Sequence, residues 1–103
     1  MSDLNKAMDA LAQRFLARCD DDLAKLEDCW KNSTDKQGEL RYIVHRMSGS
    51  AGIFGHTALG ALAAQVDGEL AAGEPVGATT LPTLIEALAS LLAGRQGKPA
   101  GSP

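Results

Sequence analysis

An apolar side chain recurs every three or four residues through roughly the first thirty residues of this chain. The positions are Leu4, Met8, Leu11, Phe15, Cys19, Leu23, Leu26 and Trp30. This spacing keeps the side chains on one face of an α-helix, so it predicts a helix of about seven turns. One helix cannot bury its own apolar face, and the rest of the chain must therefore supply elements that cover it.

Three shorter segments show the same periodicity. The Thr34-Asp35-Lys36-Gln37 sequence has the form of a capping box, and a second helix is expected from there to about Phe54, with Gly55 as a left-handed C-cap. A third helix is expected to open near Thr57 and to stop at residues 72–73. For the fourth helix, we expect Thr79 or Thr80 as the N-cap and Gly94 as the end.

Four amphipathic helices joined by short loops predict an all-α fold, an antiparallel up-down-up-down four-helix bundle. The first segment is longer than the others, which leaves open a separate short helix of the first eight or so residues across the end of the bundle. We expect one domain over residues 1–94 and a disordered tail over residues 95–103, because the tail has nothing apolar to bury.

The first helix also carries two cysteines and an acidic triplet. Cys19 and Cys29 are ten residues apart, about 15 Å along a helix axis, which is too far for a disulfide between them. We expect both to be buried thiols. The triplet Asp20-Asp21-Asp22 is expected on a solvated face, and a bend of the helix or a binding surface are the alternatives.

Charge and hydropathy exclude several classes of function. The formal net charge is −3, so there is no broad basic surface for nucleic acid. No apolar run approaches the roughly 20 residues that a membrane-spanning helix needs. The N-terminus lacks a basic start followed by an apolar stretch, so no signal peptide is evident. We therefore expect a cytoplasmic protein that binds neither nucleic acid nor membrane.

His45 stands out within the second expected helix because two glycines share its face. Gly49 follows one turn later and Gly52 about two turns later. A glycine inside a helix costs about 1 kcal/mol relative to alanine. Two such costs beside one imidazole indicate a surface kept bare for the close approach of another molecule.

The residues around His45 resemble a known family. The shared pattern is His45, Gly49, Ser50, Ala51, Gly55, Leu59, Leu62, Val66 and Asp67. It is similar to the histidine-containing phosphotransfer (HPt) domain, which carries a phosphoryl group on one histidine between receiver domains of multistep phosphorelays. The resemblance implies that His45 is the phosphoryl acceptor. The sequence departs from the family at Ser48, where a lysine is usual.

The chemistry of imidazole agrees with this role. With an unperturbed pKa of about 6.5, neutral imidazole can attack a phosphoryl group directly. In-line transfer requires the ring to be exposed and aimed outward. Because helical side chains lean toward the N-terminus, a side chain at position 49 would lean over His45, and Gly49 leaves that space for phosphoryl oxygens.

Three neighbours on the same helix are candidates to support the phosphoryl group. Ser48 could donate a hydrogen bond to the phosphate or to the ring, but it cannot supply the charge of the usual lysine. Arg41 shares the face of His45, while Arg46 points about 100° round the helix. Either arginine could partly replace the lysine, and Arg41 has the better position.

The third helix offers two candidates to orient the ring. An acceptor bonded to Nδ1–H would leave Nε2 as the nucleophile. The resemblance places Asp67 where the family usually carries an acidic or amide side chain; plain solvent exposure is the alternative, and Gln65 is a second candidate. We expect His56, at a helix junction, to be structural, and its spacing from His45 fits no common zinc pattern.

These observations predict a phosphorelay shuttle with no independent turnover. His45 would take the phosphoryl group from a receiver-domain aspartyl phosphate and pass it to another receiver, in a hybrid histidine kinase or a response regulator. No cofactor of its own is expected, and the Mg²⁺ would be held by the receiver. We expect a monomer, since the face of His45 must stay free. The alternative is a non-catalytic helical adaptor that binds a receiver domain or a partner helix.

Overall fold

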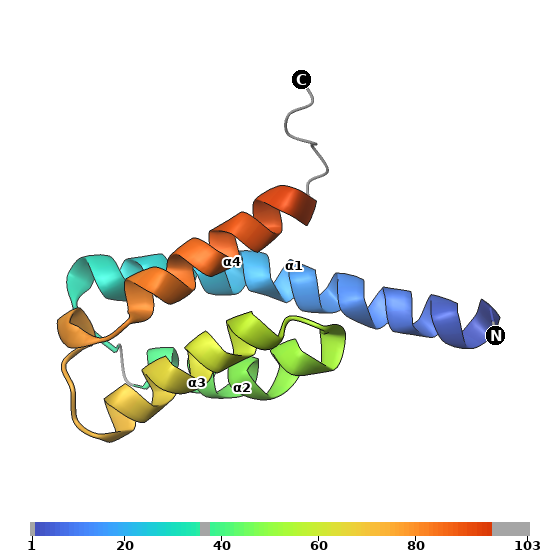
Figure 1. Ribbon diagram of the computed structural model, residues 1–103. Helices are drawn as coiled ribbons and strands as arrows, with labels where there is room; N and C mark the ends of the chain where they lie inside the picture. The colour runs from blue at the N-terminus through green and yellow to red at the C-terminus, as the bar shows by residue number, and fades with distance from the viewer. Residues whose placement is uncertain (1, 36–37, 96–103) are drawn as a thin grey trace.

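The protein is a bundle of four helices in which each helix runs antiparallel to the one before it (Figure 1). The computed structural model describes residues 2–35 and 38–95. Within these ranges the helices are α1 (Ser2–Asn32), α2 (Glu39–Ser50), α3 (Thr57–Ala71) and α4 (Leu81–Arg95). Two short 3₁₀ helices, η1 (Ala51–Phe54) and η2 (Val76–Ala78), lie between them. The all-α up-down-up-down bundle expected from the apolar periodicity is therefore confirmed.

The core forms where the apolar stripes of the four helices meet. Its fully buried members come from every helix and include Leu26, Leu40, Met47, Val66, Leu84 and Leu88. Helix α1 packs against α4, and α2 packs against α3. At Gly60 of α3, an added Cβ would lie 3.4 Å from the Cβ of Ala51 in η1 and 3.5 Å from the backbone oxygen of Ser48 in α2. Gly60 therefore lies where α3 packs against the end of the helix that carries His45.

Helix α1 is one continuous helix of 31 residues. The alternative of a separate short helix at the N-terminus, which the sequence left open, is therefore wrong. Nothing in its first turns breaks the backbone pattern: the segment lacks proline and glycine. Cys19 and Cys29 are buried thiols that form no disulfide, as expected. Of the acidic triplet, Asp22 is buried rather than solvated.

The start of α2 lies later than the sequence indicated. Part of the expected capping box, residues 36–37, lies outside the described residues. The helix begins at Glu39, after Gly38 in the left-handed conformation with φ of 85°. Asp35 still contributes to this end, since its Oδ1 accepts the backbone N–H of Arg41 at 3.1 Å.

The other helix ends follow local backbone chemistry. Helix α2 ends at Ser50 and does not continue to Phe54, because residues 51–54 form η1. Gly55 has φ of 85° and is left-handed as expected, but it caps η1 rather than α2. Thr79 Oγ1 accepts the N–H of Leu81 at 3.3 Å and so caps α4. That helix continues through Gly94 to Arg95, so Gly94 does not end it. The tail expected over residues 95–103 lies outside the described residues except for Arg95, the last residue of α4.

Candidate functional site

His45 projects from the outer side of α2. Its side chain is 80% exposed. The opposite side of the same helix is buried through Leu40, Val44 and Met47, which share the spacing of three and four residues. This packing fixes the helix behind the imidazole, so the ring is presented to solvent on a rigid support.

Asp67 of α3 holds one nitrogen of the ring. The distance from His45 Nδ1 to Asp67 Oδ2 is 3.0 Å, and the Asp67 side chain is 21% exposed. A carboxylate only accepts hydrogen bonds, so the proton of this pair belongs on Nδ1. Nε2 then carries the lone pair and faces outward. The sequence named Asp67 as a candidate for this contact, and the structure brings the two side chains together.

Arg41 contacts the same carboxylate. Its Nε lies 3.9 Å from Asp67 Oδ1, and its side chain is half exposed. Arg41, His45 and Asp67 line a shallow cavity of about 410 Å³ together with Gly38 and Tyr42. Asp67 therefore lies between the Arg41 guanidinium and the imidazole of His45. Arg41 and His45 line the same cavity.

Gly49 and Gly52 leave open space beside His45. A Cβ built at either glycine would meet no other atom within 4 Å, and neither residue has a left-handed backbone. Packing within the described chain therefore does not require glycine at these two positions.

Two of the expected supporting side chains are bonded elsewhere. The Ser48 hydroxyl donates to the backbone oxygen of His45 at 2.7 Å, so its hydrogen points into the helix and not toward the ring. The amide of Gln65 donates to Glu69 Oε2 at 3.4 Å, and no contact joins it to His45. Asp67, and not Gln65, is the residue of α3 that reaches the imidazole.

Arg46 does not belong to the site. Its Nη2 donates to both carboxylate oxygens of Asp22, at 2.8 and 2.9 Å, and the two side chains are only 20% and 5% exposed. The suggestion that Arg46 could replace the family lysine is therefore wrong. The sequence held a signal for the burial of Asp22, though not for its partner: Asp22 lies three residues after Cys19 and four before Leu26, on the buried face of α1.

His56 has the surroundings of a structural residue. Its ring stacks on Phe15 at a centroid distance of 5.6 Å and an interplanar angle of 13°. Its backbone N–H donates to Ala51 O at 2.9 Å and helps to close the turn between α2 and α3. These contacts fit the structural role expected from its place at a helix junction.

The described ranges hold neither a membrane-spanning helix nor a cluster of metal ligands. Within residues 2–35 and 38–95, no helix is long and apolar enough to cross a membrane. In the same part of the chain, no three His, Cys, Asp or Glu side chains gather into a group that could hold a metal ion.

The fold and the site together define a class of protein: an all-α bundle that presents an exposed imidazole, oriented by a carboxylate, with a glycine one helical turn away. The family model of the Hpt domain matches residues 10–96. The chain therefore belongs to the Hpt domain family, whose members carry phosphoryl groups on histidine in two-component phosphorelays and are carriers rather than classical enzymes. No curated protein and no solved structure gives a significant match to the chain.

Proposed function

We propose that His45 is the phosphoryl acceptor of this Hpt domain, and that the protein carries the group from one receiver domain to another. The observation that carries this proposal is the 3.0 Å contact between His45 Nδ1 and Asp67 Oδ2 on a side chain that is 80% exposed. An imidazole held in one orientation, with its second nitrogen open to solvent, has the geometry that a phosphoryl acceptor needs.

The transfer step follows from this geometry. The Nε2 lone pair attacks phosphorus of an aspartyl phosphate in line with the departing carboxylate oxygen. The N–P bond forms as the P–O bond breaks, and the donor aspartate leaves as a carboxylate. The Nδ1 proton stays on the ring, which becomes cationic. The Asp67 carboxylate, 3.0 Å from Nδ1, stabilises that positive charge. Transfer to the next receiver reverses these changes.

Arg41 is the cation that we propose to act in place of the usual lysine. Its contact with Asp67 at 3.9 Å is long for an ion pair, and half of its side chain is exposed, so the guanidinium can turn toward a phosphoryl group at small cost. A guanidinium can bind two phosphoryl oxygens at once. Replacing Arg41 by alanine should slow transfer, and replacing it by lysine should restore part of the rate.

We further propose that the Mg²⁺ ion used in the transfer is held by the receiver. Asp67, the carboxylate in contact with His45, already accepts the Nδ1 hydrogen bond. On this account the protein has no catalytic turnover of its own, and phosphoryl transfer requires a donor receiver and an acceptor receiver. Adding a metal chelator after the receiver has been removed should leave a preformed phosphoprotein intact.

The adaptor alternative predicts binding without chemistry. Ser48 in place of lysine, with its hydroxyl bonded to the helix, is the observation in its favour. The oriented imidazole is the observation against it, because an adaptor has no need to fix one ring tautomer.

A two-step transfer experiment separates the two functions. A labelled receiver is mixed with the protein, the receiver is removed, and a second, unlabelled receiver is added. The shuttle predicts that label moves to the protein and then to the second receiver, and that His45→Gln stops both steps while receiver binding persists. A receiver that binds the protein but never passes label to it would establish the adaptor.

A further inference from the structure

The first three turns of α1 expose an apolar stripe. Its members, called here the N-terminal stripe, are Leu4, Met8 and Leu11, which are 66%, 41% and 44% exposed. They are three of the five large apolar side chains exposed in the described part of the chain. The helix is 31 residues long and α2 only 12, and Figure 1 shows the N-terminal part of α1 extending past the turn between α2 and α3. The bundle does not cover this part of the stripe.

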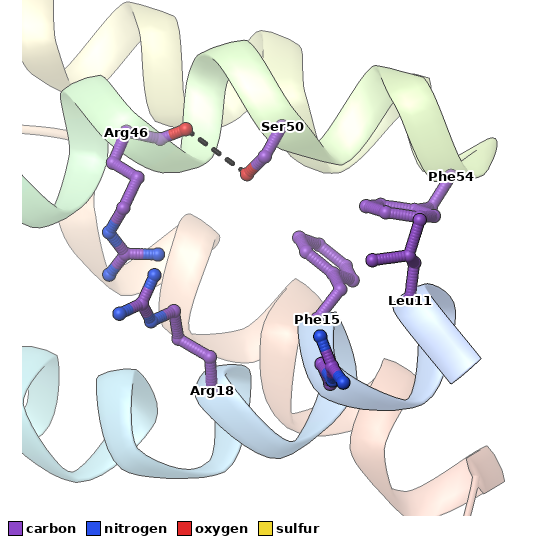
Figure 2. Close-up of a pocket in the computed structure, with 7 residues that line it drawn as sticks. Leu11, Phe15, Arg18, Arg46, Ser50 and Phe54 are labelled. Carbon is purple, nitrogen blue, oxygen red and sulfur yellow. Dashed lines mark hydrogen bonds between the residues drawn. The ribbon is translucent and has the colours of Figure 1, made fainter. Parts of the chain in front are cut away.

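A basic groove continues from the stripe. It has a volume of about 440 Å³, and Leu11, Phe15 and Phe54 form its apolar walls (Figure 2). Arg14 and Arg18 line it from α1, and neither forms an ion pair with any residue of the described ranges. We call these two residues the arginine rim. An apolar surface edged by unpaired cations fits an apolar helix that carries carboxylates.

The same helix carries that complement. Asp3 and Asp9 are exposed on the segment that bears the N-terminal stripe, and neither is paired within the described ranges. Two acids and one lysine, Lys6, thus lie toward the start of α1, and the arginine rim lies about one and a half to two and a half turns beyond Asp9. Two parallel copies would place like charges together. Two antiparallel copies place the acids of each beside the arginine rim of the other.

We propose that the protein forms a twofold dimer through antiparallel pairing of the N-terminal parts of α1. The stripe has intervals of four and three residues, the spacing of a coiled-coil seam. The N-terminal part of α1 carries the apolar stripe, the two acids and the arginine rim on one surface. A second copy of this surface is therefore complementary to it, as the isologous contact of a twofold dimer requires. An acidic amphipathic helix of another protein is the competing occupant.

The dimer leaves the phosphorelay site open. The groove is lined by α1 and by the side of α2 that bears Arg46 and Ser50. The cavity at His45 is lined by Arg41 and Asp67 among others, and it shares no residue with the groove. The expectation of a monomer rested on keeping the face of His45 free, and this pairing meets the same condition with two sites per particle. The proposal does not depend on His45 being the acceptor.

Sedimentation velocity over a wide range of protein concentration tests the proposal. The wild type should shift from monomer to dimer as concentration rises. Met8→Glu should weaken the dimer by at least about tenfold, because a charge then enters the seam. Thr83→Glu, at an exposed position of α4 that lines neither the groove nor the cavity at His45, should leave association unchanged. Circular dichroism checks that each variant keeps its helices.

Charge exchange tests the antiparallel arrangement. The pair of changes Asp3→Arg and Asp9→Arg makes one variant basic throughout this surface, and Arg14→Asp with Arg18→Asp makes the other acidic. Each variant alone should be monomeric, and an equal mixture should form a heterodimer. A wild type that stays monomeric at every concentration overturns the proposal, as does a dimer that Met8→Glu or the charge changes leave intact. A monomer that binds an acidic amphipathic peptide through Met8 establishes the competing occupant instead.

Discussion

Gly49→Ala should stabilise the protein while it slows phosphotransfer. In the free protein the new Cβ meets no atom within 4 Å, so no steric cost opposes the substitution. Alanine is favoured over glycine inside a helix by about 0.5–1 kcal/mol. For a domain of this size each kcal/mol raises Tm by about 4–8 °C, which gives a rise of roughly 2–8 °C.

The functional effect has the opposite sign. The methyl group leans toward the N-terminus of α2, over His45, and occupies space needed by phosphoryl oxygens and by the receiver. A loss of about 1.4 kcal/mol in the transition state lowers the rate tenfold, and we expect at least that. Urea unfolding followed by the fluorescence of Trp30, the one tryptophan, measures stability, and transfer from a labelled receiver measures the rate.

Gly94→Ala is the matched control. Gly94 also lies in a helix with nothing within 4 Å of its Cβ position, but on α4. It should not lower stability or alter transfer. If Gly49→Ala stabilises the protein and leaves transfer at the wild-type rate, the glycine is not kept for the partner. If it destabilises the protein, the account of free space around position 49 is incorrect.

Three further predictions concern the packing and the orientation of the site. Asp22→Leu should destabilise the protein by about 2–4 kcal/mol in urea unfolding, because Arg46 is left without its carboxylate; adding Arg46→Met should recover most of that loss, and a double variant no better than the single would refute the pairing. Asp67→Asn should slow phosphoryl acceptance from a receiver at unchanged stability, because the amide oxygen can still accept the Nδ1 hydrogen bond but carries no charge to stabilise the cationic ring; an unchanged rate would show that the charge of Asp67 is not needed. Gly55→Ala should cost about 1 kcal/mol or more, since φ is 85° there, and thermal unfolding that is unaffected would contradict this.

Much of the fold followed from apolar periodicity. The intervals of three and four residues identified the buried face of each helix, and Leu26, Met47 and Val66 are fully buried as that pattern requires. Gly55 marked a helix end because only a residue without a Cβ takes a left-handed backbone at low cost. Such signals are local, so a single chain displays them.

The differences arise where one element determines what happens to another. Periodicity shows that residues 4–11 have an apolar face, but not that α2 and α3 are too short to cover it. In the same way, Asp22 has a buried position in the pattern of α1, but its partner Arg46 lies 24 residues away on α2. Charge alone suggested that Asp22 was solvated. Contacts between distant segments decide such cases, and a pattern within one helix does not contain them.

The candidate site, like the fold, was predicted where the signal lies within one helix and not where it depends on contacts between helices. His45 and Gly49 were found by spacing along one helix, whereas Gly52 lies in η1, beyond the end of α2. Asp67 was one of two candidates on α3, and the way α3 packs against α2 determines that Asp67 and not Gln65 reaches the ring. That packing is a tertiary property.

The most direct test of the account is the chemical identity of the phosphorylated residue. The protein is labelled from a phosphorylated receiver, purified, and divided between acid and alkali, with His45→Gln treated in parallel. We predict a label that is lost in acid, retained in alkali and absent from His45→Gln, as a phosphoramidate on Nε2 requires. Label that survives acid, or that remains on His45→Gln, would place the phosphoryl group on another residue and contradict the central claim.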